Sequence, residues 1–225
     1  ESEISCIAFS HINNSKDLDI GLDMNFTGNL SLYHPKGKYQ FIVQSFQKNK
    51  SGDIWGTYLN LKKKLLKEGL FDVKNKKSIS KYPFKIGIIS SSSGAVIHDM
   101  TKIINRRTPH IEIFFKDSKI QGKDAIGDII KSIEYFNSIS SINLIILARG
   151  GGSFEDLDCF NSEKLARGIF NSKKPIISAI GHETDFTIAD YVSDLRASTP
   201  SVAAEIISQS TNDILLEISN YWIHI

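Results

Sequence analysis

Three short segments hold the side chains best suited to act on a phosphate group. They read SSSSGAVIHD (90–99), RGGGSFED (149–156) and GHETD (181–185). Each combines small or glycine residues with charged ones, and backbone N–H groups in glycine loops and at helix starts bind phosphate. The three segments therefore predict a phosphate-handling site that also contains an arginine, a histidine and carboxylates.

The three consecutive glycines at 150–152 are the most informative of these residues. A turn needs only one or two glycines, so a run of three indicates a backbone kept bare for a ligand. An anion can lie against that backbone while Arg149 neutralises its charge. We expect six residues to bind phosphate: Ser93, Gly94, Gly150, Gly151, Gly152 and Ser153.

Each of these segments also has an ordinary structural interpretation. The GGGS run is neither a P-loop nor a GxGxxG motif and could be a flexible turn. Asp99 could be a surface residue of a helix, and His182 a hydrogen-bonded loop residue. Asp185 could cap a helix that starts at Phe186. The remaining acids could simply favour a helix start through its dipole: Glu155, Asp156 and Asp158.

The elements that position these segments alternate between strands and helices. Apolar, β-branched runs at 85–89, 111–115, 142–148 and 176–180 predict buried strands. Helices are expected through 98–103, at 124–136 and 163–170, and from near 186. This alternation predicts an α/β fold with a parallel sheet covered by helices on both faces. Ligands bind beyond the carboxyl ends of such strands, which is where the three segments begin.

The remainder of the chain divides into smaller parts. Residues 1–50 predict a small, incomplete antiparallel β unit, with a hairpin at 28–46 that turns at Pro35–Gly37. Residues 51–84 predict a linker helix, capped by Asp53 and ended by Gly69, and a lysine-rich connector. Residues 85–200 form the α/β catalytic domain, and 201–225 begin a C-terminal helical region that runs toward the end of the sequence.

Composition sets limits on the class of protein. The chain has 225 residues, 41% of them hydrophobic, which is enough for one substantial core and a smaller unit. The net charge of +2 is not strongly basic, so it gives no general indication of nucleic-acid binding. Cys6 and Cys159 lie far apart, which argues against a disulfide framework and indicates a reducing compartment. No signal peptide or membrane span is visible, and the start at Glu1 indicates a fragment.

The sequence resembles a known family over nearly its whole length. The blocks KIGIISSSSGAVIHD, RGGGSFEDLDCFN and GHETDFTIADYVSDLRASTPSVAAE, in this order, are similar to signature blocks of the exodeoxyribonuclease VII large subunit. The segment GNLSLYHPKGKYQFIV is similar to the last strands of that family's OB-type DNA-binding domain. The resemblance implies a bacterial, cytoplasmic nuclease that cuts single-stranded DNA from either end into short 5′-phosphorylated oligonucleotides. It also implies that several copies of a small subunit bind a long C-terminal helical region.

The resemblance also assigns catalytic positions. The family's functional residues correspond to Asp99, Arg149, His182 and Asp185 of this chain. The chain departs from the family at neighbouring positions without losing a reactive group: Ser92, Ala148, Asp158 and Ser198. The family is described as needing no divalent metal, so no cofactor is expected. The residues alone leave Mg²⁺ open, because two carboxylates and a histidine are ordinary metal ligands.

Two other functions remain open from the residues. A nucleotide-diphosphate-binding module, without nuclease activity, would use the GGGS run for a diphosphate. Alternatively, the β unit would bind single strands by stacking bases on Tyr33, Tyr39 and Phe41. For the fragment we expect weak, salt-dependent DNA binding through its lysines: Lys62, Lys63, Lys64, Lys67, Lys76 and Lys77.

Overall fold

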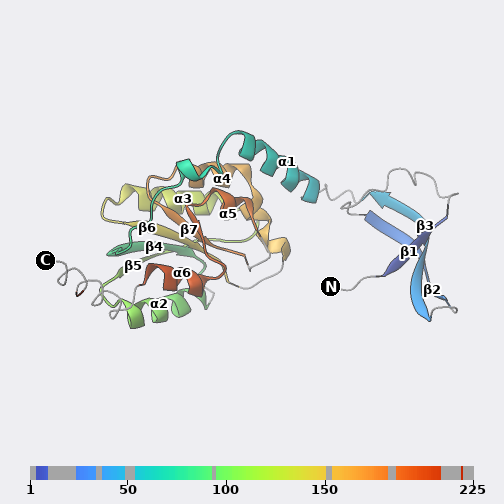
Figure 1. The fold of residues 1–225 in the computed structure, drawn as a ribbon, viewed down its shortest axis with the longest axis horizontal. Coiled ribbons are helices and arrows are strands. Elements are labelled where there is room, and N and C mark those ends of the chain that lie inside the picture. The colour runs from blue at the N-terminus through green and yellow to red at the C-terminus, as the bar shows by residue number, and fades with distance from the viewer. Residues whose placement is uncertain are drawn as a thin grey trace. The chain divides into compact units, whose positions relative to one another are not determined.

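The computed structural model describes residues 4–9, 24–33, 37–48, 54–92, 95–150, 154–181, 186–208 and 219. It consists of two compact units, residues 1–63 and 64–225 (Figure 1). In the described part of the chain, no helix has both the length and the apolar composition needed to cross a lipid bilayer.

The smaller unit is a three-stranded sheet with the order β1-β3-β2. Strands β2 (Met24–Tyr33) and β3 (Lys38–Lys48) form the predicted antiparallel hairpin. Strand β1 (Ser5–Ala8) instead pairs with β3 in parallel, so the sheet is mixed rather than wholly antiparallel. The register shifts at Thr27/Gly28, where a Cβ on Gly28 would lie 2.0 Å from the Ile42 carbonyl oxygen. Only glycine fits this bulge.

Helix α1 (Ile54–Lys67) carries the chain from one unit into the other. The predicted 3–4 spacing is confirmed at its C-terminal end, where Leu65 is fully buried in the larger unit. Gly69 has a φ of +79° and the Leu70 N–H donates to the Leu65 carbonyl, so the helix ends at the glycine as expected. The predicted cap, Asp53, lies outside the described residues.

The larger unit is built on the expected parallel sheet. Its five strands have the order β5-β4-β6-β7-β8, and every neighbouring pair is parallel. The bounds are β4 (Lys85–Ser90), β5 (Glu112–Asp117), β6 (Leu144–Ala148), β7 (Ile176–Ala179) and β8 (Leu195–Arg196). The sequence did not indicate β8, because two residues are too short for a periodic pattern.

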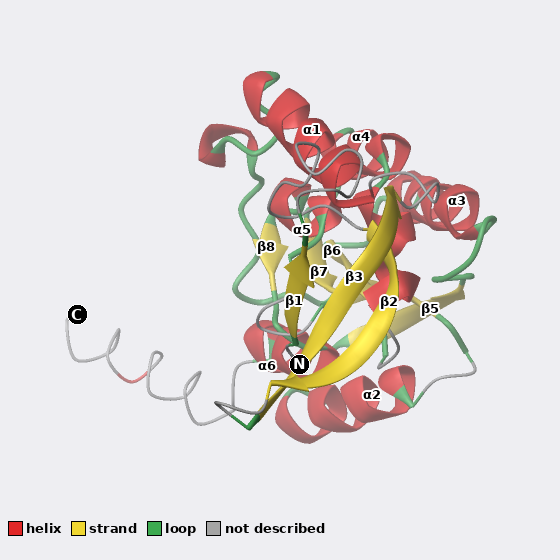
Figure 2. Cartoon of the chain, turned by 90° about the vertical axis from the view of Figure 1, so that its right-hand side faces the viewer, coloured by secondary structure: helices red, strands yellow, loops and turns green. Residues whose placement is uncertain are grey.

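Helices cover both faces of this sheet, as predicted (Figures 1 and 2). One face carries α2 (Val96–Arg107) and α6 (Pro200–Ile207); the other carries α3 (Ala125–Ser138), α4 (Glu163–Phe170) and α5 (Ile188–Val192). Right-handed crossovers explain the division. The step from β4 to β5 runs in one direction across the sheet, and every later step runs in the other, which places the later crossover helices on the opposite face.

The core lies between the sheet and these two helix layers. On the α2 and α6 side, strand residues such as Ile88 and Ile146 pack with Met100, Ile104 and Ala204 in one buried cluster. On the α3 side, β4 carries Gly87, where a Cβ would meet the Phe136 ring at 2.8 Å. The glycine thus lets the phenyl ring of α3 lie directly on the strand.

Helix α6 is shorter than the sequence predicted. It ends at Ile207, because Ser208 has an extended conformation and its hydroxyl donates back to the Ala204 carbonyl. A serine hydroxyl that donates to the carbonyl four residues earlier competes with the backbone hydrogen bonds that would continue the helix. The other positions of the expected stripe, from Ser210 to Ile218, lie outside the described residues.

Candidate active site

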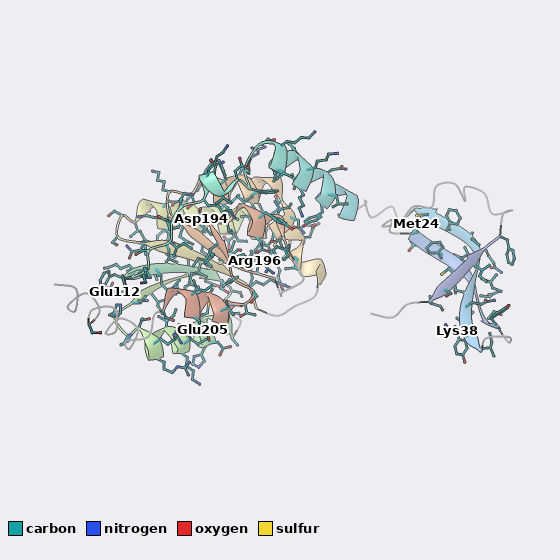
Figure 3. All side chains as sticks on the ribbon, viewed as in Figure 1. Met24, Lys38, Glu112, Asp194, Arg196 and Glu205 are labelled. Atoms are coloured by element: carbon teal, nitrogen blue, oxygen red, sulfur yellow. The ribbon has the colours of Figure 1, made fainter. Side chains whose placement is uncertain are left out.

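The sheet has a switch point between β4 and β6. These strands are neighbours, but the chain leaves β4 toward one side of the sheet and leaves β6 toward the other. The connections diverge there and leave a crevice at the carboxyl edge, the usual ligand position in open α/β sheets. Glu112 begins β5 and Arg196 ends β8, the two outermost strands of the sheet, and both residues are labelled in Figure 3.

A pocket of about 340 Å³ lies at this carboxyl edge. Four segments that are distant in sequence line it: the start of α2, the residues after β6, the residues after β7, and the start of α6. The lining residues are Ala95, Val96, Asp99, Arg149, Gly150, Ile180, Gly181, Ser198, Thr199, Pro200 and Ser201. Two of the four predicted catalytic residues, Asp99 and Arg149, therefore lie on one pocket.

Arg149 follows β6 directly and extends its pairing with β7. Its N–H donates to the Ala179 carbonyl at 3.0 Å, and only 4% of the residue is exposed. A guanidinium stays charged when buried, so this position supplies a permanent cation at the pocket wall. The next residue, Gly150, lies against α2, because a Cβ there would lie 3.0 Å from Val96 Cγ2. The glycine thus allows close packing as well as an exposed backbone.

Two helix N-termini meet the same pocket. Helix α2 starts after Ala95, which provides no side-chain cap, and Asp99 lies in its exposed first turn. Helix α6 starts with Pro200 after Thr199, whose hydroxyl accepts a hydrogen bond from the Val202 N–H at 3.1 Å. The partial positive charge of both helix ends adds to that of Arg149. The pocket therefore favours an anion, with one carboxylate at its wall.

The other predicted site residues lie outside the described residues: His182, Asp185, Ser93, Gly94, Gly151, Gly152 and Ser153. Their described neighbours Gly150 and Gly181 both line the pocket. Whether the three glycine-containing segments act together on a ligand remains a prediction. Among the residues described, no three His, Cys, Asp or Glu side chains are grouped closely enough to hold a metal ion. Because His182 and Asp185 are not among them, the metal alternative stays open.

Helix α5 begins with a capping box that the sequence analysis missed. Thr187, not Asp185, is its N-cap, so the structural role considered for Asp185 is filled by another residue. The Thr187 hydroxyl accepts from the Asp190 N–H, and the Asp190 carboxylate accepts from the Thr187 N–H at 2.8 Å. The spacing Thr-x-x-Asp is the sequence signal of this motif.

The Asp190 carboxylate also joins the cap to the sheet. It is buried and accepts a hydrogen bond from the Ser178 hydroxyl of β7 at 2.7 Å, while Arg196 Nε of β8 lies 4.0 Å away. The Arg196 guanidinium lies 3.8 Å from the centre of the Phe186 ring. These contacts fix the chain immediately after residues 182–185.

Several of the lysines expected to bind DNA also make contacts within the protein. Lys64 pairs with Glu163 at 2.8 Å, and Lys77 lies 3.7 Å from the Asp194 carboxylate. Lys76 donates to the carbonyl oxygens of Tyr191 and Ser193. Burial lowers the pKa of the Lys76 ammonium, and the Asp194 carboxylate partly offsets this. Lys64, Lys76 and Lys77 therefore all make contacts within the larger unit, residues 64–225.

Comparison with known proteins points to one family. The family model described as exonuclease VII, large subunit, matches residues 70–223. The exodeoxyribonuclease 7 large subunit of Clostridium botulinum strain Loch Maree is 46% identical over 222 residues, covering 98% of this chain and 55% of the relative. That of Clostridium kluyveri strain ATCC 8527 is 44% identical over 224 residues, covering 98% and 56%. The chain thus spans about half the length of these curated relatives.

One solved structure has a weak likeness to the chain. It is an ABC transporter solute binding protein from Bacillus halodurans with bound myo-inositol, with a TM-score of 0.30 and 16% identity, covering 45% of this chain and 32% of its own. A likeness of this size supports no statement about function.

Proposed function

Because the chain belongs to the exonuclease VII large-subunit family, we propose that it carries the site that hydrolyses phosphodiester bonds of single-stranded DNA. The reaction would proceed from either end of the strand and release short 5′-phosphorylated oligonucleotides. One observation supports this most strongly. A single pocket at the switch point of the sheet joins Asp99 and Arg149 with the N-termini of α2 and α6.

This arrangement suits the charge requirements of phosphodiester hydrolysis. The reaction needs an activated water, stabilisation of the extra negative charge on the phosphate oxygens, and a proton for the leaving oxygen. Arg149 and the two helix ends supply the second requirement, since fixed cations and N–H donors act where charge develops. Asp99, at the wall of the same pocket, is placed to orient the water or a proton carrier.

Proton transfer is assigned to His182. A histidine titrates near neutral pH and can act as acid or base, with Asp185 orienting its ring. In this scheme the pocket needs no resident metal. The competing scheme makes Asp99, His182 and Asp185 ligands of a divalent cation that activates the water. The two schemes differ in whether a chelator stops the reaction.

The partners follow from the same proposal. Single-stranded DNA is the substrate, and several copies of a small subunit bind the complete large subunit through its C-terminal helical region. The cytoplasm is the proposed location. The β unit would add a second contact with the strand, because Tyr33 and Tyr39 are both exposed there.

A cleavage assay on end-labelled single-stranded DNA tests this proposal. The full-length protein with its small subunit is incubated with the DNA in excess chelator and, separately, with Mg²⁺. We expect short 5′-phosphorylated products at similar rates in both. Activity that disappears with chelator and returns with Mg²⁺ or Mn²⁺ would reassign Asp99, His182 and Asp185 as metal ligands. Tight binding of a nucleoside diphosphate without any cleavage would support the nucleotide-binding alternative instead.

A further inference from the structure

A second pocket adjoins the candidate active site along the outer side of α2. Its volume is about 260 Å³, and its lining residues are Asp99, Lys102, Ile103, Arg106 and Ser201. Asp99 and Ser201 also line the larger pocket, so the two pockets meet at these residues. The second pocket therefore lies directly beside the candidate active site, with Asp99 and Ser201 common to both.

Two cations dominate this second pocket. Lys102 and Arg106 are both exposed, and they follow Asp99 at positions i+3 and i+7 on the same side of α2. Within the described residues, neither side chain takes part in an ion pair or hydrogen bond. The neighbouring Arg107 differs, because its Nε donates to the Ser208 carbonyl at 2.9 Å. Arg107 thus has a structural role, whereas Lys102 and Arg106 remain available to a ligand.

The frame that carries these cations is rigid. Met100 and Ile104 of α2 pack with Ala203, Ala204 and Ile207 of α6 in the buried core. The Arg107–Ser208 hydrogen bond ties the C-terminal ends of the two helices together. The walls of the second pocket are therefore fixed with respect to the active site, as a binding subsite requires.

We propose that Lys102 and Arg106 form a phosphate subsite that binds the substrate strand beside the bond being hydrolysed. This inference rests on the proposed nuclease function. It adds the position of the part of the strand next to the reacting phosphate. Arg106 is about 10 Å along the helix from Asp99, so it reaches past the phosphate held at Arg149. None of the described residues that line this pocket is aromatic. The pocket therefore suits the phosphate backbone rather than a stacked base.

The proposal predicts a binding role that is separate from the chemistry. Lys102 and Arg106 would contact phosphates that do not react, so losing them should raise KM and leave the turnover of a minimal substrate unchanged. The contacts are electrostatic, so their loss should also reduce the dependence of affinity on salt. Each phosphate contact on a single strand contributes a slope of about 0.7 in log affinity against log salt.

The test compares two double variants of the full-length protein with its small subunit. Lys102→Ala/Arg106→Ala removes the subsite, and Lys131→Ala/Lys164→Ala removes two exposed lysines from α3 and α4 on the opposite face. The substrates are a long single-stranded oligonucleotide and a dinucleotide without terminal phosphates, in which the only phosphate is the one that reacts. We expect the subsite variant to raise KM about tenfold for the oligonucleotide only and to lower the salt slope by roughly 1.4, about 0.7 for each of the two lost contacts. The control should match the wild type.

Equal KM values and salt slopes for the two double variants would overturn the subsite. An equal loss on the dinucleotide would also overturn it, because Lys102 and Arg106 would then act at the reacting phosphate. If the wild type cleaves no single-stranded DNA, the proposed function fails. In that case the affinity for the same oligonucleotide is measured by fluorescence titration of the wild type and both variants. The subsite requires that only Lys102→Ala/Arg106→Ala lowers the affinity and its salt dependence.

Discussion

Arg149 and Asp190 show how differently two buried charged residues can be recognised from sequence. Arg149 stood out because it separates a buried strand from three glycines, and the structure places it at the wall of the pocket with Asp99. For Asp190 the Thr-x-x-Asp spacing signals only the capping box with Thr187, because its other partners, Ser178 and Arg196, come from strands β7 and β8. Local sequence reveals a residue beside an unusual neighbour, but not one whose partners are distant in the chain.

At the residue scale we predict that Asp190→Ala is strongly destabilising. The Ser178 hydroxyl and the Thr187 N–H would lose their acceptor, and Arg196 would lose the nearby carboxylate. A loss of about 3 kcal/mol in the free energy of unfolding is expected from such a buried network. Urea denaturation measures it. Asp124→Ala is the control, since Asp124 is exposed and makes no side-chain cap at α3. Equal stabilities would show that the network contributes little.

Element boundaries were predictable where the pattern was local. Helix α4 occupies the expected 163–170, and Gly69 ends α1 through its positive φ. Two predictions were incomplete or wrong. Strand β8 is held by pairing with β7 rather than by its own two residues, and α6 stops early because Ser208 bonds back to its own helix. Pairing with a distant strand thus determined β8, and a side-chain hydrogen bond of Ser208 determined the end of α6.

At the element scale two glycine substitutions should have opposite effects. Gly87→Ala in β4 would drive a methyl group into the Phe136 ring, 2.8 Å away, and should lower the free energy of unfolding by about 1–3 kcal/mol. Gly127→Ala in α3 meets nothing within 4 Å and should raise it by about 0.5–1 kcal/mol. Thermal or urea unfolding of both variants provides the comparison. If Gly87→Ala were as stable as Gly127→Ala, the contact of α3 with the sheet at this position would be wrong.

At the scale of the whole molecule, the sequence indicated that Asp99 and Arg149 lie at one edge of the sheet, but not which other segments line their pocket. The parallel sheet follows from the alternation of apolar strands and helices, and it brings Asp99 and Arg149 to one edge. The strand order and β8 were needed to see that α6 returns to this edge and adds Ser198 to Ser201. The position of Lys102 and Arg106 beside the pocket likewise depends on the packing of α2 against α6.

The central claim is that Arg149 stabilises a reacting phosphate in the pocket between α2 and α6. Single-turnover cleavage of labelled single-stranded DNA by Arg149→Ala, in the full-length protein with its small subunit, tests it most directly. We predict a rate lower by about a hundredfold or more, the size expected for losing one transition-state charge stabiliser. Arg149→Lys should recover little of this rate, because lysine lacks the planar guanidinium fork. If the alanine variant unfolds, the cleavage rate of the lysine variant is the test. Near-normal cleavage by a folded Arg149→Ala variant, with an unchanged melting temperature, would contradict the assignment.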